Sequence, residues 1–195
     1  MPIRLFVGLG NPTDQYKNTR HNFGFIVLDS IAQAKGLEFK NWNSLADISF
    51  YSKNPQEKIY LLKPLTFMNN SGGAVADFAK YYKIAPDEIF VFYDDFAMNL
   101  GTFRVRLSGS SAGHNGLKSL ISRLGGENFP RMKLGIGPIP EYMKTIDFVL
   151  SKFRQEDKAA VDLIVQKAVS FFDEAIDLGL EKAISKLNLL PPLRD

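Results

Sequence analysis

EIFVFYDD, residues 88–95, is an unbroken apolar run that ends in two carboxylates. Such a run, too short for a helix and rich in aromatic and β-branched residues, is typical of a strand buried in a sheet. IRLFVGL at residues 3–9 has the same character and stops at a glycine followed by Asn11-Pro12. The two runs therefore predict two buried strands with polar residues at their carboxyl ends.

Segments of helical and strand character alternate along the rest of the chain. Apolar residues recur at helical spacing within 22–35, 70–83, 116–124, 155–178 and 180–187, before a Pro-Pro tail. Shorter runs predict a hairpin around Asn54-Pro55 and two later strands: 47–53, 58–64, 103–107 and 132–137. This order predicts an α/β fold with a mixed, mostly parallel sheet, and the absence of a linker or repeat favours one domain over residues 1–195.

Composition excludes several classes of protein. The 195 residues are 45% hydrophobic and 23% charged, as in an ordinary globular protein. With no cysteine, the chain has no disulfides, thiolate catalysis or cysteine-bound metal, and its two histidines disfavour a histidine-built metal site. The start of the chain resembles neither a signal peptide nor a membrane span, which favours a cytoplasmic protein without a membrane partner.

Positive charge is concentrated in one part of the sequence. The net charge is only +3, but residues 102–133 hold six lysines and arginines and a single carboxylate, Glu127. A basic segment in a nearly neutral chain indicates a surface that faces a polyanion, and a merely solvated basic face is the alternative.

Two glycine-rich motifs suggest other functions. GLGNPT at 8–13 lacks the third glycine of a dinucleotide-binding fingerprint, and no phosphate-binding P-loop motif is present. GSSAG at 109–113 matches the G-x-S-x-G motif of serine hydrolases, with Ser111 as nucleophile. Such enzymes need a histidine further along the chain, whereas the last histidine, His114, lies three residues after Ser111. A small-molecule serine esterase is therefore kept only as an alternative.

His21 is the stronger candidate for a base. It lies in a polar run, residues 16–22, immediately before a predicted helix whose positive end favours the neutral imidazole that a general base needs. An aspartate beside the ring would fix its tautomer and raise its basicity, and Asp94 at the end of a buried strand is the natural partner. The alternative roles are a surface or capping histidine and an aspartate that caps a turn.

Three asparagines stand at the starts of predicted helices, where capping is their usual role. Asn69 and Asn70 precede one helix, and Asn115 precedes another. Their amides could instead bind an ester carbonyl and the oxyanion that forms from it. Phe67 and Met68 belong either to the core or to an apolar floor under a substrate.

The combination of motifs resembles the bacterial peptidyl-tRNA hydrolase family over nearly the whole chain. The matching segments occur in family order: VGLGNP-x3-Y-x2-TRHN-x-GF at 7–25, KP-x-TFMN-x-SG at 63–72, YDD at 93–95, GHNGLKS at 113–119, LGIG at 134–137 and FVLSKF at 148–153.

The resemblance implies an enzyme that hydrolyses the ester between a peptide and the 3′ ribose of tRNA. It implies a monomer without metal or cofactor, built as one α/β domain whose twisted mixed sheet is flanked by helices. The resemblance places the catalytic pair on His21 and Asp94, and the tRNA phosphate contacts on Arg106 and Lys133. Its substrate-binding residues fall on Asn11, Tyr16, Met68, Asn69 and Asn115. A tRNA-binding module without catalysis is the other alternative.

This sequence departs from the family pattern at four positions. Thr13 and Ala112 replace usual glycines, and Ala97 replaces a usual carboxylate. Lys133 replaces a more frequent arginine, which exchanges a two-pronged phosphate contact for a point charge.

Overall fold

In the computed structural model, residues 2–188 are described, and the predicted Pro-Pro tail at 191–192 lies outside them. A single seven-stranded sheet runs through the molecule in the order β2-β3-β4-β1-β5-β7-β6. Strands β4, β1, β5 and β7 run parallel to one another, whereas β2 pairs antiparallel with β3, β3 with β4, and β6 with β7. The strands are β1 Leu5–Gly8, β2 Lys40–Trp42, β3 Ala46–Asn54, β4 Glu57–Pro64, β5 Ile89–Asn99, β6 Phe103–Arg106 and β7 Arg131–Gly137.

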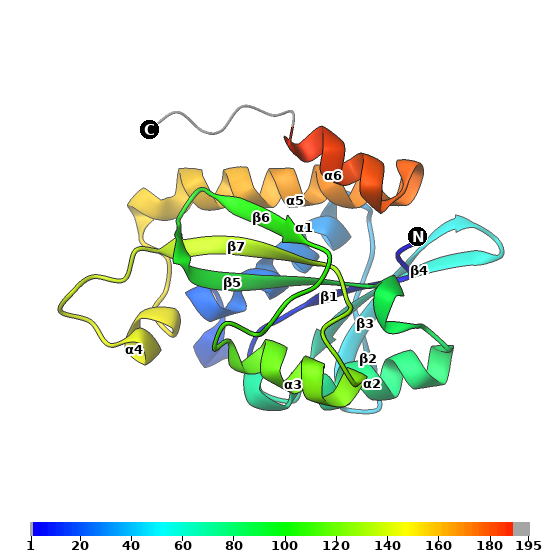
Figure 1. Ribbon diagram of the computed structural model, residues 1–195, viewed down its shortest axis with the longest axis horizontal. Coiled ribbons are helices and arrows are strands. Elements are labelled where there is room, and N and C mark those ends of the chain that lie inside the picture. Colours follow the sequence, from blue (N-terminus) through cyan, green and yellow to red (C-terminus); the bar gives the residue numbers. More distant parts are fainter. Residues whose placement is uncertain (1, 189–195) are drawn as a thin grey trace.

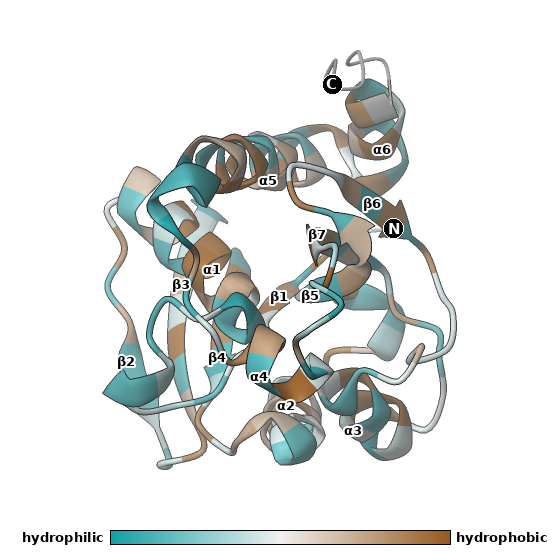
Figure 2. Ribbon diagram, turned by 90° about the vertical axis from the view of Figure 1, so that its left-hand side faces the viewer, coloured by the Kyte–Doolittle hydropathy of each residue, from teal (hydrophilic) through white to brown (hydrophobic). Residues whose placement is uncertain are grey.

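Helices cover both faces of this sheet. Helices α1, α5 and α6 lie on one face, and α2 and α3 lie on the other (Figures 1 and 2). The helices are α1 Phe23–Ala34, α2 Ser71–Tyr82, α3 Asn115–Leu124, α4 Thr145–Val149, α5 Lys158–Leu178 and α6 Leu180–Asn188. The predicted α/β fold with a mixed, mostly parallel sheet flanked by helices is confirmed. None of the helices within residues 2–188 is both long and apolar enough to cross a bilayer.

The alternation of side chains along β5 divides the core in two. Phe90 and Phe92 face α1 and α5, whereas Val91 and Tyr93 face α2 and α3. Because both faces of this strand are covered, it reads as a continuous apolar run rather than an alternating one.

Two short elements escaped the sequence prediction, β2 and α4. Each has only three to five residues, which is too short for a periodic pattern to be visible. Strand β2 forms one edge of the sheet, and α4 follows the loop after β7.

Strand β5 does not end at its two carboxylates, as the sequence predicts, but continues to Asn99. Its pairing with β7 shifts register between Asp95 and Asn99, so the extra residues bulge over the neighbouring strand. Glycines of β7 make room for this bulge: a Cβ on Gly135 would lie 2.1 Å from the Asn99 carbonyl oxygen. The Asp94 side chain therefore lies within the strand, where the backbone fixes it more firmly than at a loose end.

Candidate active site

The side chains of His21 and Asp94 meet although 73 positions separate them in the sequence. The His21 Nδ1 atom lies 3.0 Å from both carboxylate oxygens of Asp94. Asp94 is almost completely buried, and the His21 side chain is 12% exposed. The imidazole therefore connects a buried carboxylate to solvent.

The approach of these residues depends on tight packing of the chain around His21. His21 lies in the 3₁₀ turn Arg20–Asn22, directly before α1. The first turn of α1 rests on the end of β1 and on the middle of β5, because a Cβ on Gly24 would lie 2.4 Å from the Leu9 nitrogen and 2.5 Å from the Phe92 oxygen. Only glycine permits this contact, which holds His21 above the carboxyl ends of the central strands.

A third ring, that of His114, which was not among the predicted site residues, joins the pair. Its Nε2 lies 3.1 Å from the Oδ1 atom of Asp94, and its Nδ1 accepts a 3.3 Å hydrogen bond from the Leu117 nitrogen as the N-cap of α3. Because Nδ1 accepts, the proton of the neutral ring sits on Nε2 and is donated to Asp94. The signal in the sequence was that His114, the only histidine besides His21, begins a predicted helix.

Opposing effects set the charges of the cluster. Burial alone would raise the pKa of Asp94, but the charges and hydrogen bonds of His21 and His114 lower that pKa well below its usual range. For His21, burial disfavours the charged ring, yet attraction to the Asp94 carboxylate prevails and raises the His21 pKa. Asp94 is therefore ionised near neutral pH, and His21 is a stronger base than an ordinary histidine.

His21, Asp94 and His114 also form a group that metal ions could use, with ligand atoms within 4.8 Å of one another. The tautomer of His114 opposes this. Its Nε2, the atom nearest to Asp94, carries the proton as long as Nδ1 accepts from Leu117, whereas a metal ligand must be unprotonated. The donor set fits a hydrogen-bonded cluster better than a metal site.

Among the three asparagines predicted to bind substrate, Asn11, Asn69 and Asn115, the first is mainly structural in its contacts. Its Oδ1 accepts a 2.7 Å bond from the Met68 nitrogen, and its backbone exchanges two 2.9 Å bonds with the Asn22 side chain. These contacts join the loop after β1 to the turn that carries His21, so only the NH2 end of Asn11 remains for a ligand.

Asn69 and Asn115 are exposed, and neither caps a helix. The N-cap of α3 is His114, and Asn70 at the N-cap of α2 makes no capping bond through its side chain. Within residues 2–188, the amides of Asn69 and Asn115 make no hydrogen bond to other protein groups. The capping alternative is therefore wrong for both residues, and their donors and acceptors are available to a ligand.

Apolar side chains lie beside these amides. Met68 is 4% exposed, and its sulfur packs against Gly116, where an added Cβ would lie 2.6 Å away. Phe67 is 49% exposed, and its ring meets the edge of Tyr16 with centroids 6.3 Å apart. Met68 thus belongs to the core, whereas Tyr16 and Phe67 offer aromatic surface to a bound molecule.

The basic segment is only partly a surface. Arg131 is buried and donates to the carbonyl oxygens of Gly109, Glu127 and Phe129, so its inclusion in a polyanion-facing surface is wrong. It instead satisfies backbone groups of two loops that would otherwise be left unpaired.

The remaining basic residues lie near the free edge of the sheet and on α3. Arg104, Arg106, Lys118 and Arg123 are exposed, while Lys133 is half-buried and 2.9 Å from a carboxylate oxygen of Asp95. Cross-strand pairing of Arg104 with Lys133 places Arg104, Arg106 and Lys133 on one face of the sheet. The two predicted phosphate contacts, Arg106 and Lys133, therefore share a face of the sheet, but the Lys133 ammonium is already paired with the Asp95 carboxylate.

The serine-esterase alternative finds no base in this arrangement. Ser111 precedes α3 in a loop, and both ring nitrogens of the nearby His114 are engaged, by Asp94 and by Leu117. A serine nucleophile needs an adjacent base with a free nitrogen, so the Ser111 alternative is not supported.

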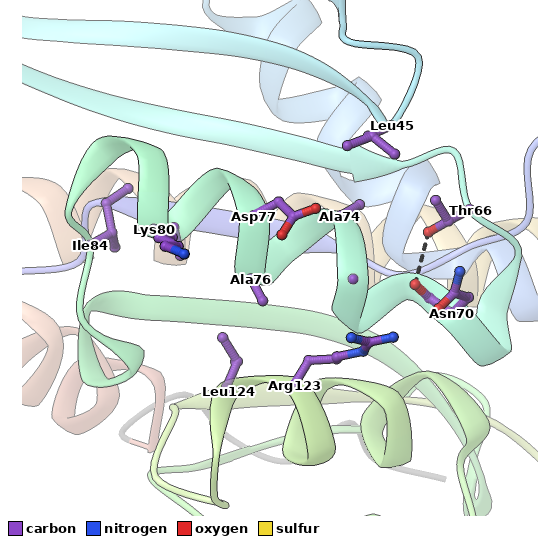
Figure 3. Close-up of a pocket in the computed structure, with 12 residues that line it drawn as sticks. Leu45, Thr66, Asn70, Ala74, Ala76, Asp77, Lys80, Ile84, Arg123 and Leu124 are labelled. Atoms are coloured by element: carbon purple, nitrogen blue, oxygen red, sulfur yellow. Dashed lines mark hydrogen bonds between the residues drawn. The ribbon is translucent and has the colours of Figure 1, made fainter.

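Two cavities adjoin the site without containing the histidines. A groove of about 550 Å³ runs between α2 and α3 and is lined by Thr66, Asn70, Asp77, Lys80 and Arg123 among others (Figure 3). At the end of the groove that Asn70 lines, the Thr66 hydroxyl donates a 2.9 Å hydrogen bond to the backbone carbonyl oxygen of Asn70. A second cavity of about 330 Å³ lies behind the loop after β1 and includes Asn11 and Asn22.

Two of the family departures fall where the backbone is strained. Thr13 has φ 80° and ψ 150°, and Ala112 has φ 46°. Glycine adopts these angles freely, whereas a β-branched residue such as threonine adopts them only at a cost of about 1–3 kcal/mol.

Replacing Thr13 with glycine is expected to raise the free energy of unfolding by about 1 kcal/mol, because relief of strain exceeds the added entropy of the unfolded chain. Chemical denaturation measures the change. As a control, Ala76→Gly in the middle of α2 should lower the unfolding free energy by up to about 1 kcal/mol. A loss of stability in Thr13→Gly would contradict the strain.

Comparison with known proteins identifies the family to which this chain belongs over nearly its whole length. The sequence model of the family described as peptidyl-tRNA hydrolase matches residues 5–193. A peptidyl-tRNA hydrolase of Elusimicrobium minutum is 42% identical over 186 residues, covering 95% of this chain and 99% of that protein. The one from Aquifex aeolicus is 38% identical over 188 residues, covering 96% and 97%. The crystal structure of peptidyl-tRNA hydrolase from Acinetobacter baumannii matches with a TM-score of 0.88 and 33% identity, over 97% of this chain and 96% of the other.

Proposed function

Since this chain belongs to the peptidyl-tRNA hydrolase family, we propose that His21, oriented by Asp94, activates the water that cleaves the ester of peptidyl-tRNA. The chain is an ester-hydrolysing enzyme of this family. The contact at 3.0 Å between the His21 Nδ1 and the ionised Asp94 carries the proposal, because it leaves Nε2 of a partly exposed ring to act as the base.

The tautomer of His21 follows from its partner. A buried, ionised carboxylate can only accept, so the Nδ1 of a neutral His21 carries the proton and donates it to Asp94. The lone pair on Nε2 then accepts a hydrogen bond from water. Because the raised pKa of His21 strengthens this base, proton removal from water is easier than with an isolated imidazole.

In the first step, the water oxygen attacks the ester carbonyl carbon while Nε2 takes a proton from the water. The carbonyl oxygen becomes an oxyanion, and amide N–H groups of Asn69 and Asn115 are suited to stabilise it because no group within the described residues 2–188 uses them. The free NH2 end of the Asn11 amide helps to orient the peptide backbone.

In the second step, the bond between the carbonyl carbon and the ribose 3′ oxygen breaks. The proton on Nε2 passes to that oxygen, which restores neutral His21 and releases tRNA with a free 3′ hydroxyl. The peptide leaves with a carboxylic acid, and Asp94 remains ionised throughout. Tyr16, with Phe67 beside it, supplies apolar surface next to the reacting ester. Met68 stays in the core and holds Asn11 through its backbone nitrogen.

Arg106 and Lys133 hold tRNA phosphates in this proposal. They share a face of the sheet with Arg104, and a phosphate would compete with Asp95 for the Lys133 ammonium. Arg106 is therefore the better isolated of the two contacts, because it is exposed and makes no ion pair within residues 2–188.

Arg106→Ala is expected to raise KM several-fold at physiological salt, leave kcat within about twofold, and reduce the salt slope of log(kcat/KM) by about one. Steady-state kinetics across a salt series measures all three. Lys58→Ala is the matched control, since Lys58 is also exposed but lies on β4, separated from β6 by three strands. A fall in kcat alone would remove Arg106 from the phosphate contacts.

One assay separates the proposed reaction from its alternatives. The protein is incubated with N-acetyl-aminoacyl-tRNA, with unblocked aminoacyl-tRNA and with a small chromogenic ester. The proposal requires rapid cleavage of the first, slow cleavage of the second and none of the third, with most turnover lost in His21→Ala. Cleavage of the chromogenic ester with labelling by a serine-directed phosphonate would favour Ser111, and tRNA binding without cleavage would indicate a binding module.

We also propose that the protein is a cytoplasmic monomer folded as one domain over residues 1–195. The single sheet with a core on each face supports one domain. A substrate made on ribosomes supports a cytoplasmic location.

A further inference from the structure

Arg20, the residue before His21, is an arginine buried in the core of the molecule. Its side chain is 6% exposed, as is usual for an apolar residue and unusual for a guanidinium. A buried charge at this place needs several compensating contacts, and the chain supplies them at both terminal nitrogens of the guanidinium, whereas Nε has no hydrogen-bond partner within residues 2–188.

All of these contacts come from one segment, residues 148–157, more than 125 positions further along the chain. The guanidinium donates to the Asp157 carboxylate at 2.7 Å, to the Ser151 hydroxyl at 2.9 Å and to the Lys152 carbonyl oxygen. It lies over the rings of Phe148 and Phe153, with its carbon 4.8 and 5.1 Å from their centroids.

The backbone repeats the same connection. The backbone nitrogen of Arg20 donates a 2.9 Å hydrogen bond to the backbone carbonyl oxygen of Ser151, and the neighbouring Thr19 forms an isolated antiparallel bridge with Lys152. Side chain and backbone thus bind the turn that carries His21 to the end of α4 and the start of α5.

His21 is consequently held between two buried polar residues. On its other side, Asn22 is 4% exposed and binds the backbone of Asn11 through both ends of its amide. Asn22 fixes the turn to the loop after β1, while Arg20 fixes it to residues 148–157. With both neighbours anchored, the ring of His21 has little freedom to move away from Asp94.

We propose that Arg20, paired with Asp157, is a positioning residue that keeps the His21 imidazole aligned with Asp94. This rests on the proposed role of His21, but the alignment itself can be measured without turnover. The choice of arginine is explained by geometry: a planar fork reaches a carboxylate, a hydroxyl and a carbonyl at once and lies over two aromatic rings, whereas a lysine ammonium cannot do all of these.

Asp157 extends the anchor to α5. One of its oxygens also accepts a 2.8 Å bond from the Arg154 nitrogen, and the Arg154 side chain reaches the same carboxylate at 3.5 Å from outside. Arg154 is 67% exposed, so the carboxylate contacts one buried and one exposed arginine. Arg154 therefore provides a matched control for Arg20, because both arginines contact the same carboxylate but only Arg20 is buried.

The test compares Arg20→Lys with Arg154→Lys. Arg20→Lys is expected to lower kcat tenfold or more at nearly unchanged KM, since small misplacements of a catalytic group cost about 10–100-fold. Arg154→Lys should change neither constant by more than about twofold, because exposed ion pairs contribute little.

The second readout is NMR titration of the histidine rings, which is simple here because the chain contains only two. In Arg20→Lys, the titration of His21 should move to lower pH, towards that of a histidine without a carboxylate partner, while His114 keeps its signals. A general loss of stability would not move one ring selectively. Asp157→Asn should give the same shift, and Ser151→Ala a smaller one, and these variants carry the test if Arg20→Lys does not fold.

Unchanged His21 titration and unchanged kcat in folded Arg20→Lys or Asp157→Asn would overturn the proposal. If His21 titrates differently but kcat does not respond, the positioning role is correct and the catalytic role of His21 is wrong. The two failures are therefore distinguishable.

Discussion

Replacing His21 with alanine is expected to lower kcat by about 10²–10⁴-fold, the contribution of a positioned general base. Its Nε2 is the only ring nitrogen of the cluster that no protein group within residues 2–188 occupies, since the His114 nitrogens contact Asp94 and Leu117. No neighbouring group can therefore take over proton removal. Single-turnover hydrolysis of N-acetyl-aminoacyl-tRNA measures the loss.

The same variant should bind tRNA with nearly unchanged affinity, because the exposed basic side chains lie on β6 and α3 rather than on the turn before α1. Circular dichroism and a filter-binding assay supply this control. Turnover within about threefold of the parent would remove His21 from the chemistry, however well the ring is placed.

Asp94→Asn is expected to have the second largest effect and to change the pH dependence as well. An asparagine that keeps its oxygen towards His114 turns its NH2 towards the His21 Nδ1, which must then accept and leaves the proton on Nε2. This is the wrong tautomer for a base. We expect kcat to fall by about 10²–10³-fold, less than in His21→Ala because some molecules retain the active tautomer.

The sign of the pH effect follows from the pKa of His21. Only neutral His21 accepts a proton from water, so activity rises with pH through the His21 pKa. Asp94 raises this pKa, and the acid limb of the parent should lie above the value of about 6.5 found for an ordinary histidine. In Asp94→Asn, burial still disfavours the charged ring while the attraction is gone, so the limb should move to lower pH. A limb that stays in place would exclude the pairing.

The sequence was sufficient to predict the fold and the central pair, because both depend on local patterns. Apolar runs that stop at polar residues predicted strands whose ends meet, and His21 and Asp94 follow from that topology. The prediction that each strand ends at its polar residues was less accurate. The β5 bulge depends on glycines in β7, which are forty positions away.

The remaining features depend on contacts between distant segments. His114 could not be assigned because its two bonds, to Asp94 and to Leu117, exist only after α3 docks against β5. From the sequence, Arg131 is expected to be a surface charge. In the structure it is buried and donates hydrogen bonds to three carbonyl oxygens of neighbouring loops. A single chain gives no signal that separates such a residue from the exposed Arg106.

The most direct test of the account measures His21 twice in the free enzyme. NMR gives the pKa of its ring, and the pH dependence of kcat/KM on N-acetyl-aminoacyl-tRNA gives the pKa of the base that reacts. We predict that the two values coincide above that of an ordinary histidine, with Nδ1 protonated and Nε2 free in the neutral form. A kinetic pKa that differs from the His21 titration, or a proton found on Nε2, would contradict it.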